Sequence, residues 1–283
     1  MTYEELWRPM TTVYDAGEAR AVTRWLLEVG FGLSMADIIS GGIERLSDAE
    51  QQRLSTMHQR LLHGEPVQYV AGKADFGPLQ LEVSPKVLIP RPETYELCQW
   101  VLSTFSGNSQ RKDNPQTVLD IGTGSGCIAC TLALQLPETE VTAWDISAEA
   151  LAVAQRNAEA LQADVTFEER DALHLPTELD RWDIIVSNPP YILQQEAKDM
   201  ERHVLEHEPH LALFVPNEHP LLFYRAIAHY ARKALKRHGS LYFEINALYG
   251  NELLSMLHEE GLEETEVRCD QFGKQRFIKA IRP

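Results

Sequence analysis

The first 66 residues carry apolar side chains at helical spacing. Apolar residues recur at intervals of three and four in two stretches, around 19–29 and 54–62, which indicates amphipathic helices. Ser34 and Ser47 stand at N-cap positions, each with an acid three residues later, as in a capping box. We therefore expect residues 1–66 to form a small helical bundle, with no obvious catalytic cluster.

A change of pattern follows the bundle. A Gly-Pro turn signal at 77–78 precedes alternating apolar and polar residues, which predicts a β-hairpin. Pro90 and Pro92 fix an extended segment after this hairpin. We expect residues 67–92 to form a hairpin linker between the bundle and a second domain, residues 93–283.

Short apolar runs alternate with helical stretches in the second domain, apart from a polar, turn-rich segment at 106–115 that predicts a loop. The predicted strands are 118–121, 141–144, 165–167, 182–186, 240–245, 264–269 and 276–281. The predicted helices are 94–105, 126–135, 148–161, 221–236 and 251–260. This alternation indicates an α/β fold with a mostly parallel sheet and right-handed crossovers. Ligands of such sheets bind beyond the carboxyl ends of the strands.

The charge of the chain argues against nucleic acid as a direct partner. The chain has 26 basic and 42 acidic side chains, a net charge of −16, whereas proteins that bind a phosphate backbone concentrate Lys and Arg. The strongest basic run, 232–238, is expected to end a helix and to complement its dipole. No apolar run is long enough to cross a membrane, and the acidic N-terminus lacks a signal-peptide core. We expect a cytoplasmic protein.

Two motifs have spacings that are typical of metal or redox sites, but we expect neither to act as one. Cys127 and Cys130 have C-x-x-C spacing, but they open an apolar helix, so we expect inert, buried thiols. His203 and His207 match a zinc pattern, but Pro209 ends any helix there and no third ligand is evident. We expect no metal site and no disulfide.

A glycine-rich segment follows the first strand of the second domain. Residues 120–126 read Asp-Ile-Gly-Thr-Gly-Ser-Gly, and glycines let the backbone turn sharply and a ligand approach closely. Asp145 ends the next strand and suits ribose hydroxyls, while Asp171 follows the third and suits the exocyclic amine of adenine. Each acid alone suits an N-cap, and the glycine spacing alone discriminates weakly. Together they predict one nucleoside held across successive strand ends, with Asp120 contributing to an acidic lining for a sulfonium.

The fourth strand of this domain ends in Asn188-Pro189-Pro190-Tyr191. The Asn188 carboxamide oxygen and the Pro189 carbonyl are predicted to accept the two N–H bonds of a planar NH2 group. These bonds orient the group and help its lone pair to localise toward an incoming methyl. Tyr191 offers a flat face for stacking. The alternative is a structural Pro-Pro turn, but the motif ends a strand of the same sheet as the glycine loop, where sites gather.

With these motifs the chain resembles the peptide chain release factor N5-glutamine methyltransferases, the PrmC/HemK family. The resemblance extends over nearly the whole chain. The segments that carry it are 64–69, 76–77, 88–94, 120–126, 154–158, 186–191, 208–209, 212–213, 243–244 and 273–276. Asn-Pro-Pro-Tyr alone is shared with adenine-N6 methyltransferases, and the Pro-Arg-Pro-Glu-Thr segment at 90–94 makes the assignment specific.

The resemblance implies a class I Rossmann-like methyltransferase domain with a mostly parallel seven-stranded sheet, preceded by a small helical bundle and a β-hairpin linker. It implies S-adenosylmethionine as cofactor, released as S-adenosylhomocysteine. The implied cofactor-binding residues are Asp120, Gly122, Thr123, Gly124, Ser125, Gly126, Asp145, Asp171, Ala172 and Asn188. The implied catalytic and substrate-binding residues are Asn188, Pro189, Pro190 and Tyr191, with Leu88 and Arg91 near the pocket.

Three functions follow from these features. The first is methylation of the glutamine in the Gly-Gly-Gln loop of class I release factors, by a monomeric enzyme. The second is an adenine-N6 or other nucleic-acid amino methyltransferase, against which the charge of −16 counts. The third is a non-catalytic binding protein that kept the fold. Two positions depart from the family pattern, namely Tyr95, where a second acid is common, and Ala172, where a bulky residue is common.

Overall fold

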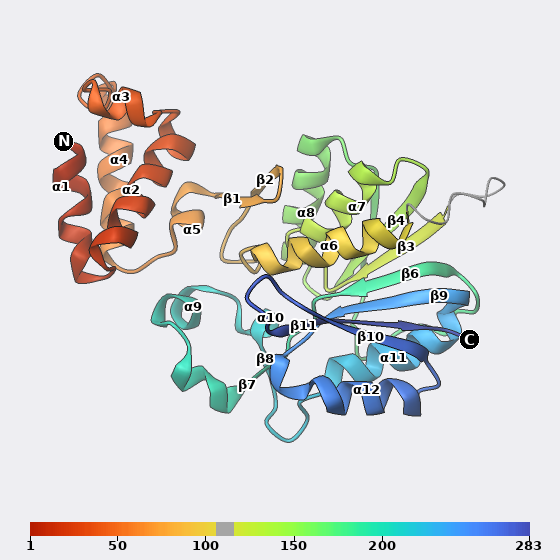
Figure 1. Cartoon of the computed structure of the whole chain (residues 1–283). Coiled ribbons are helices and arrows are strands. Elements are labelled where there is room, and N and C mark those ends of the chain that lie inside the picture. Colours follow the sequence, from red (N-terminus) through yellow and green to blue (C-terminus); the bar gives the residue numbers. More distant parts are fainter. Residues whose placement is uncertain (106–115) are drawn as a thin grey trace. The chain divides into compact units, whose positions relative to one another are not determined.

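The chain forms two compact units in a computed structural model that describes residues 1–105 and 116–283. The first unit holds Met1–Lys73 together with Val83–Pro85 and Met200–Glu208, and the second holds the rest. Figure 1 labels the elements of both units. The loop predicted at 106–115 lies outside the described residues.

The first unit is helical, as its periodicity predicts. Its N-terminal helices are α1 (Tyr3–Trp7), η1 (Pro9–Thr12), α2 (Ala16–Phe31), α3 (Met35–Ile39), α4 (Asp48–Leu62) and α5 (Val67–Ala71). Ser34 and Ser47 form the predicted capping boxes with Asp37 and Glu50. A core that includes Leu27, Leu54 and Leu61 holds the helices together. The short helix α9 (Arg202–His207) clusters with this unit.

The second unit is built on a seven-stranded sheet in the order β10-β11-β9-β6-β3-β4-β5. Its strands are β3 (Gln116–Ile121), β4 (Thr139–Asp145), β5 (Val165–Glu169), β6 (Trp182–Ser187), β9 (Leu235–Glu244), β10 (Glu263–Cys269) and β11 (Gln275–Ile281). The strands from β9 through β5 pair in parallel, whereas β11 runs antiparallel to both β9 and β10. The predicted α/β fold with a mostly parallel sheet is confirmed.

Helices cover both faces of this sheet (Figure 1). The helices are α6 (Pro92–Phe105), α7 (Cys127–Gln135), α8 (Ala148–Leu161), α10 (His210–Leu213), α11 (Leu222–Ala234) and α12 (Gly250–Glu259), with short 3-10 turns η2 (Gln194–Asp199) and η3 (Ala247–Tyr249). Helices α11 and α12 share one buried core with the sheet, and α6 and α7 share the other. The parallel strands β3, β4 and β6 are therefore largely buried on both faces, as their continuous apolar runs predict, whereas the edge strand β5 is more exposed.

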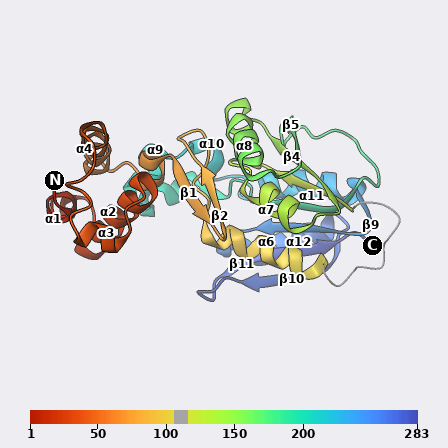
Figure 2. The same ribbon diagram turned by 90° about the horizontal axis from the view of Figure 1, so that it is seen from above.

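Two smaller pairings complete the unit. The predicted hairpin is present as β1 (Lys73–Phe76) and β2 (Leu79–Glu82), and β2 lies beside α8 (Figure 2). Strands β7 (Ile192–Leu193) and β8 (Phe214–Val215) form a two-residue parallel pair. The expected domain boundaries after residues 66 and 92 stay a prediction.

The sequence interpretation placed one element wrongly. The basic run at 232–238 was expected to end a helix, but α11 ends at Ala234 and β9 begins at Leu235. Only Arg232 and Lys233 stand in the last helical turn. Strand pairing prevails because it buries Leu235 completely against β6 and lets Lys236 bind Asp183 at 2.6 Å.

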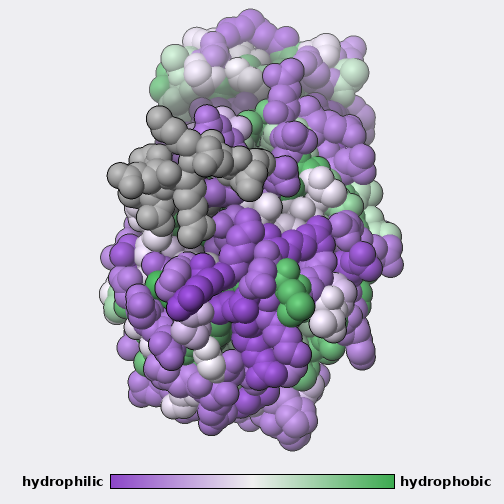
Figure 3. Space-filling view, turned by 90° about the vertical axis from the view of Figure 1, so that its right-hand side faces the viewer, coloured by the Kyte–Doolittle hydropathy of each residue, from purple (hydrophilic) through white to green (hydrophobic). Residues whose placement is uncertain are grey.

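The surface is mainly polar on the face shown in Figure 3, where hydrophobic side chains are scattered among hydrophilic ones. Scattered exposed apolar residues are normal for globular proteins. Among the described residues, no helix combines the length and the apolar character that crossing a bilayer requires.

Candidate active site

The glycine loop lies between the end of β3 and the start of α7. Gly122, Gly124 and Gly126 have φ values of 76°, 54° and 80°, a region that favours glycine. A Cβ added at Gly122 or Gly124 would meet no heavy atom within 4 Å, whereas one at Gly126 would lie 3.1 Å from the Ala154 Cβ. The first two glycines thus leave open space along the loop, and the third lets α7 pack against α8.

Hydrogen bonds hold the loop against the end of β4. The Gly122 and Thr123 amides donate to the Trp144 carbonyl at 2.8 and 3.0 Å, and the Gly124 amide donates to Asp145 Oδ2 at 2.9 Å. Asp145 is half-buried, and burial raises the pKa of its carboxyl group. The structure therefore brings the predicted ribose-binding acid and the predicted loop together.

Asp120 lies fully buried beneath the loop. Its Oδ2 accepts a hydrogen bond from the Thr123 hydroxyl at 2.6 Å, while its Oδ1 has no hydrogen-bond partner among the described residues. Burial raises the pKa of Asp120 to about 7. A buried carboxylate oxygen without a partner is costly, and a cationic ligand would relieve that cost. The open space at the glycines and this oxygen together fit S-adenosylmethionine.

Asp171 lies two residues beyond the end of β5, close to Asp145. The intervening Arg170 donates its amide hydrogen to the Asp145 carbonyl at 2.9 Å. Asp171 accepts from the Leu173 amide at 2.8 Å and contacts His174 Nδ1 at 2.6 Å, and the His174 hydrogen bond lowers the pKa of Asp171. The Asp171 carboxylate therefore stabilises the turn at residues 171–174, and only its remaining lone pairs are available to a ligand.

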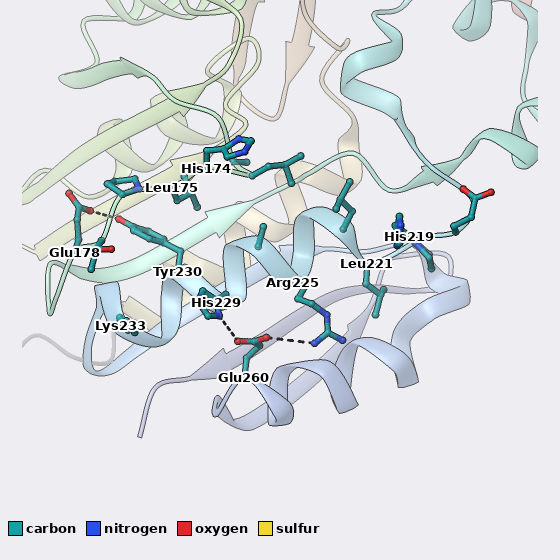
Figure 4. Close-up of a pocket in the computed structure, with 18 residues that line it drawn as sticks. His174, Leu175, Glu178, His219, Leu221, Arg225, His229, Tyr230, Lys233 and Glu260 are labelled. Carbon is teal, nitrogen blue, oxygen red and sulfur yellow. Dashed lines mark hydrogen bonds and ion pairs between the residues drawn. The ribbon is translucent and has the colours of Figure 1, made fainter.

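A cavity of about 930 Å³ opens beside this turn, between the segment 172–178 and α11 (Figure 4). Ala172 lines it, together with α11 and the segment before α11. Several of its charged groups bind one another. Glu260 contacts Arg225 and His229, and Tyr230 donates to Glu178. This internal pairing gives no sign that the cavity binds a ligand.

The acceptor motif follows β6, next to the glycine loop in the sheet. The buried Ser187 hydroxyl donates to the Ile121 carbonyl at 2.6 Å, which ties the end of β6 to the end of β3. Asn188 and Tyr191 are half-buried. The structure thus places the motif at the same sheet edge as the loop, as the rule for strand ends predicts.

A buried hydrogen-bond chain supports the motif from behind. Asn188 Nδ2 donates to Thr94 Oγ1 at 3.1 Å, and the Thr94 hydroxyl donates to Glu244 Oε2 at 2.6 Å. The Tyr191 hydroxyl donates to the other oxygen of Glu244, Oε1, at 3.1 Å. Three distant elements, α6, β6 and β9, therefore meet at this point.

Charged and polar neighbours surround the acceptor motif. Arg276 binds Asp270 at 3.2 Å, and its positive charge counteracts the rise in the pKa of Glu244 that burial causes. Burial likewise raises the pKa of Tyr191. Asn246 Nδ2 donates to the Tyr191 carbonyl at 3.3 Å. The Tyr191 hydroxyl thus stays protonated, and hydrogen bonds hold both this hydroxyl and the main-chain carbonyl of Tyr191.

Leu88 and Arg91 lie in the segment that leads into α6. The Thr94 amide donates to the Arg91 carbonyl at 3.1 Å, so Arg91 stands one turn from the hydrogen-bond chain. Both side chains are half-buried. Their role near the acceptor pocket stays a prediction.

The sequence interpretation did not assign three residues to the site. Thr94 and Glu244 support the acceptor motif, and both are nearly fully buried. Asn157 in α8 donates to the Ser125 carbonyl and to the Glu82 carbonyl, each at 2.9 Å, and so holds the glycine loop against β2. The signal that could have identified Glu244 as a supporting residue is its position as a polar residue among apolar ones at a strand end.

The C-x-x-C motif and the His203–His207 pair were expected to bind no metal. Cys127 and Cys130 are buried, and burial raises the pKa of each thiol, that of Cys130 to about 12. Their interpretation as buried thiols is confirmed. The structure shows no group of three metal-binding side chains among residues 1–105 and 116–283.

Two family profiles match this chain. The profile described as the PrmC N-terminal domain matches residues 13–72, and that of the methyltransferase small domain matches residues 99–211. A release factor glutamine methyltransferase of Bacteroides thetaiotaomicron is 43% identical over 273 residues, which cover 95% of each chain. Its counterpart in Flavobacterium psychrophilum is 39% identical, over 95% of this chain and 94% of its own.

Solved structures share the fold at lower identity. The hMettl16 catalytic domain, in complex with an RNA hairpin, superposes with a TM-score of 0.55 at 17% identity, over 83% of this chain and 82% of its own. This likeness bears on the fold alone, since the sequences diverge so far. The full-length relatives decide the family, and the chain belongs to the release factor glutamine methyltransferases.

Proposed function

We propose that this protein transfers a methyl group from S-adenosylmethionine to the side-chain amide nitrogen of the glutamine in the Gly-Gly-Gln loop of class I release factors. The observation that carries this proposal is the orientation of Asn188. Its Nδ2 donates to Thr94, so its Oδ1 lies on the opposite branch of the amide and is left to accept from a substrate. An acceptor of this kind suits an NH2 group.

The cofactor site that we propose combines the glycine loop with three acids. Gly122 and Gly124 leave room along the loop, and Asp145 accepts from ribose hydroxyls with the lone pairs that the loop does not use. Asp171 and Ala172 border the adenine, and Asp120 balances positive charge beneath the loop. When bound there, S-adenosylmethionine supplies the methyl group as an electrophile.

The acceptor chemistry that we propose rests on orientation. A planar amide nitrogen is a poor nucleophile because its lone pair is delocalised into the carbonyl. Asn188 Oδ1 and the Pro189 carbonyl accept its two N–H bonds, while Pro190 shapes the pocket and Tyr191 stacks on the amide plane. These bonds strengthen as the nitrogen gains positive charge, so they favour the transition state over the bound substrate. No strong base is needed before the transfer, because the nitrogen becomes acidic only afterwards.

Further parts of the proposal concern the setting of the enzyme. We place the activity in the cytoplasm, on a monomer whose residues 1–66 form a domain, 67–92 a linker and 93–283 the methyltransferase domain. The net charge of −16 supports a protein rather than a nucleic acid as the substrate. No observation favours the adenine-N6 alternative, although the acceptor motif is compatible with it.

A side-by-side transfer assay tests the proposal. The protein is incubated with S-adenosylmethionine and either a class I release factor or adenine-containing DNA, and products are read by mass spectrometry. We expect one methyl group on the glutamine of the Gly-Gly-Gln loop and none on the DNA. Methylated adenine, or an unmodified release factor, would refute the proposed substrate.

A further inference from the structure

The acceptor pocket contains a buried carboxylate for which the proposed transfer has no role. Glu244 ends β9 and is 2% exposed. Its two oxygens accept from two different hydroxyls, Oε2 from Thr94 at 2.6 Å and Oε1 from Tyr191 at 3.1 Å. Burial raises the pKa of Glu244, and the hydrogen bonds from Thr94 and Tyr191 and the positive charge of Arg276 oppose that rise. In its ionised form the carboxylate accepts on both oxygens and donates from neither, so both hydroxyls then direct their hydrogens toward Glu244.

This arrangement decides the direction of the next hydrogen bond. A hydroxyl has a single hydrogen, and Thr94 gives it to Glu244. Thr94 can then only accept from Asn188, whose Nδ2 lies 3.1 Å away. The oxygen and nitrogen of an asparagine amide are told apart by the network around them. Here the network leaves one choice, with Nδ2 toward Thr94 and Oδ1 away from it.

We propose that Glu244 is a positioning residue that sets the hydrogen-bond polarity of the acceptor pocket. Through Thr94 it makes Asn188 present an acceptor oxygen, and through its second oxygen it holds the Tyr191 ring. The inference rests on the proposed function, in which a glutamine amide donates two N–H bonds. A pocket with this polarity binds the amide of glutamine and disfavours the carboxylate of glutamate, which has acceptors only.

The surroundings of Glu244 fit this role. The positive charge of Arg276 in β11, which pairs with Asp270, opposes the rise in the pKa of Glu244 that burial causes. The Tyr224 hydroxyl donates to the Glu244 main-chain carbonyl at 3.1 Å, which fixes the backbone at this residue. The carboxylate is thus held in place by main-chain and side-chain contacts from three different elements.

Thr94 offers the cleanest substitution. Thr94→Val keeps the shape of the side chain and removes the hydroxyl, so that Asn188 loses its orienting partner. Leaving the Asn188 donor unpaired disfavours its present orientation, and we expect kcat to fall about tenfold to a hundredfold, with unchanged affinity for S-adenosylmethionine. Thr94→Ser keeps the hydroxyl and should restore kcat to within about threefold.

A matched control separates this effect from the general loss of a buried hydroxyl. Thr131 in α7 is fully buried, and its hydroxyl donates to the Cys127 carbonyl at 2.7 Å. Thr131→Val should lower thermal stability as Thr94→Val does, but leave kcat unchanged. If both variants lose kcat equally, the role of Thr94 is structural and the inference is wrong.

Glu244→Gln tests the polarity itself. Glutamine has one acceptor oxygen and one donor NH2 group, so it cannot accept from both hydroxyls. If the NH2 group faces Thr94, the chain reverses and Asn188 turns Nδ2 toward the substrate. If it faces Tyr191, the Tyr191 oxygen accepts from it, and the hydroxyl hydrogen of Tyr191 loses the acceptor that Glu244 provides. Either way kcat should fall at least about tenfold.

The specificity readout compares two ligands. Affinity is measured for a class I release factor and for the same factor with its Gly-Gly-Gln glutamine replaced by glutamate. The preference of the wild type for glutamine should shrink about tenfold in Glu244→Gln, because the Asn188 group that faces the substrate changes from an acceptor to a donor. A tenfold change corresponds to about 1.4 kcal/mol. Unchanged preference together with unchanged kcat would overturn the inference. Loss of transfer by the wild type would instead refute the proposed function.

Discussion

Asp120 is expected to make cofactor affinity depend on pH. Its pKa lies at about 7 because burial disfavours the charged form. The nearby charge that adds to this rise is Asp145, whereas hydrogen bonds from Thr123 and from the Ala129 backbone oppose it. The Cys127 and Cys130 thiols stay neutral because burial raises the pKa of both. S-adenosylmethionine is a cation at its sulfonium and favours the ionised carboxylate.

The magnitude follows from the fraction of Asp120 that is ionised. With a pKa of about 7, about one tenth of the free enzyme is ionised at pH 6 and about nine tenths at pH 8. If the ionised form alone binds tightly, the apparent Kd is the intrinsic Kd divided by this fraction. The Kd for S-adenosylmethionine should therefore fall about tenfold between pH 6 and pH 8.

Isothermal titration calorimetry of the wild type and of Asp120→Asn measures this effect. The isosteric amide keeps the acceptor for Thr123 and does not titrate as the carboxyl does, so the variant should lose most of the pH slope. S-adenosylhomocysteine lacks the sulfonium charge, so its titration shows whether Asp120 balances the charge of the sulfonium. Equal slopes for the wild type and Asp120→Asn would refute the reasoning.

The raised pKa of Asp120 also makes the stability of the ligand-free protein depend on pH. The folded pKa of Asp120, about 7, lies above its ordinary value of 3.8, so the folded state binds more protons between these values. Its contribution to stability is present below pH 4 and is lost as pH rises toward 7, by on the order of 4 kcal/mol. Denaturant unfolding of wild type and Asp120→Asn at pH 5 and pH 8 checks the sign.

Three further substitutions test other parts of the site. Gly126→Ala should lower stability by about 1–3 kcal/mol, because its φ of 80° disfavours a side chain and the new Cβ would press on Ala154; a melting temperature equal to that of wild type would contradict this. Asn188→Ala should reduce turnover at least about a hundredfold while calorimetry still detects cofactor binding, whereas full turnover would remove Asn188 from the mechanism. Asn157→Ala should weaken cofactor affinity about tenfold because the Ser125 carbonyl loses its donor, and an unchanged Kd would show that the loop holds itself.

The success of the sequence interpretation depended on local patterns. Hydrophobic periodicity predicted the hairpin and the long helices, and short apolar runs predicted all seven strands of the sheet, because the burial of these elements is visible in the local sequence. The error at 235–238 has the same origin. Basic residues there favour a helix end locally, but pairing with β6 and the ion pair with Asp183 prevail.

The motifs were visible because they lie at strand ends. Asp120 to Gly126, Asp145 and Asn188 to Tyr191 each follow a predicted strand, and parallel strands bring their carboxyl ends to one edge. This rule needs only the order of elements along the chain. It says nothing of the direction of a hydrogen bond or of the surroundings of a carboxylate.

The sequence by itself thus determined the fold class and the edge of the sheet at which the predicted motifs lie. Only the tertiary structure decided how these residues are held. Thr94 bonds to Glu244, 150 positions away, and to Asn188, 94 positions away. The pKa of Asp120 depends on burial by several elements. Hydrogen-bond partners and burial are set by long-range packing, and no local period of the chain encodes them.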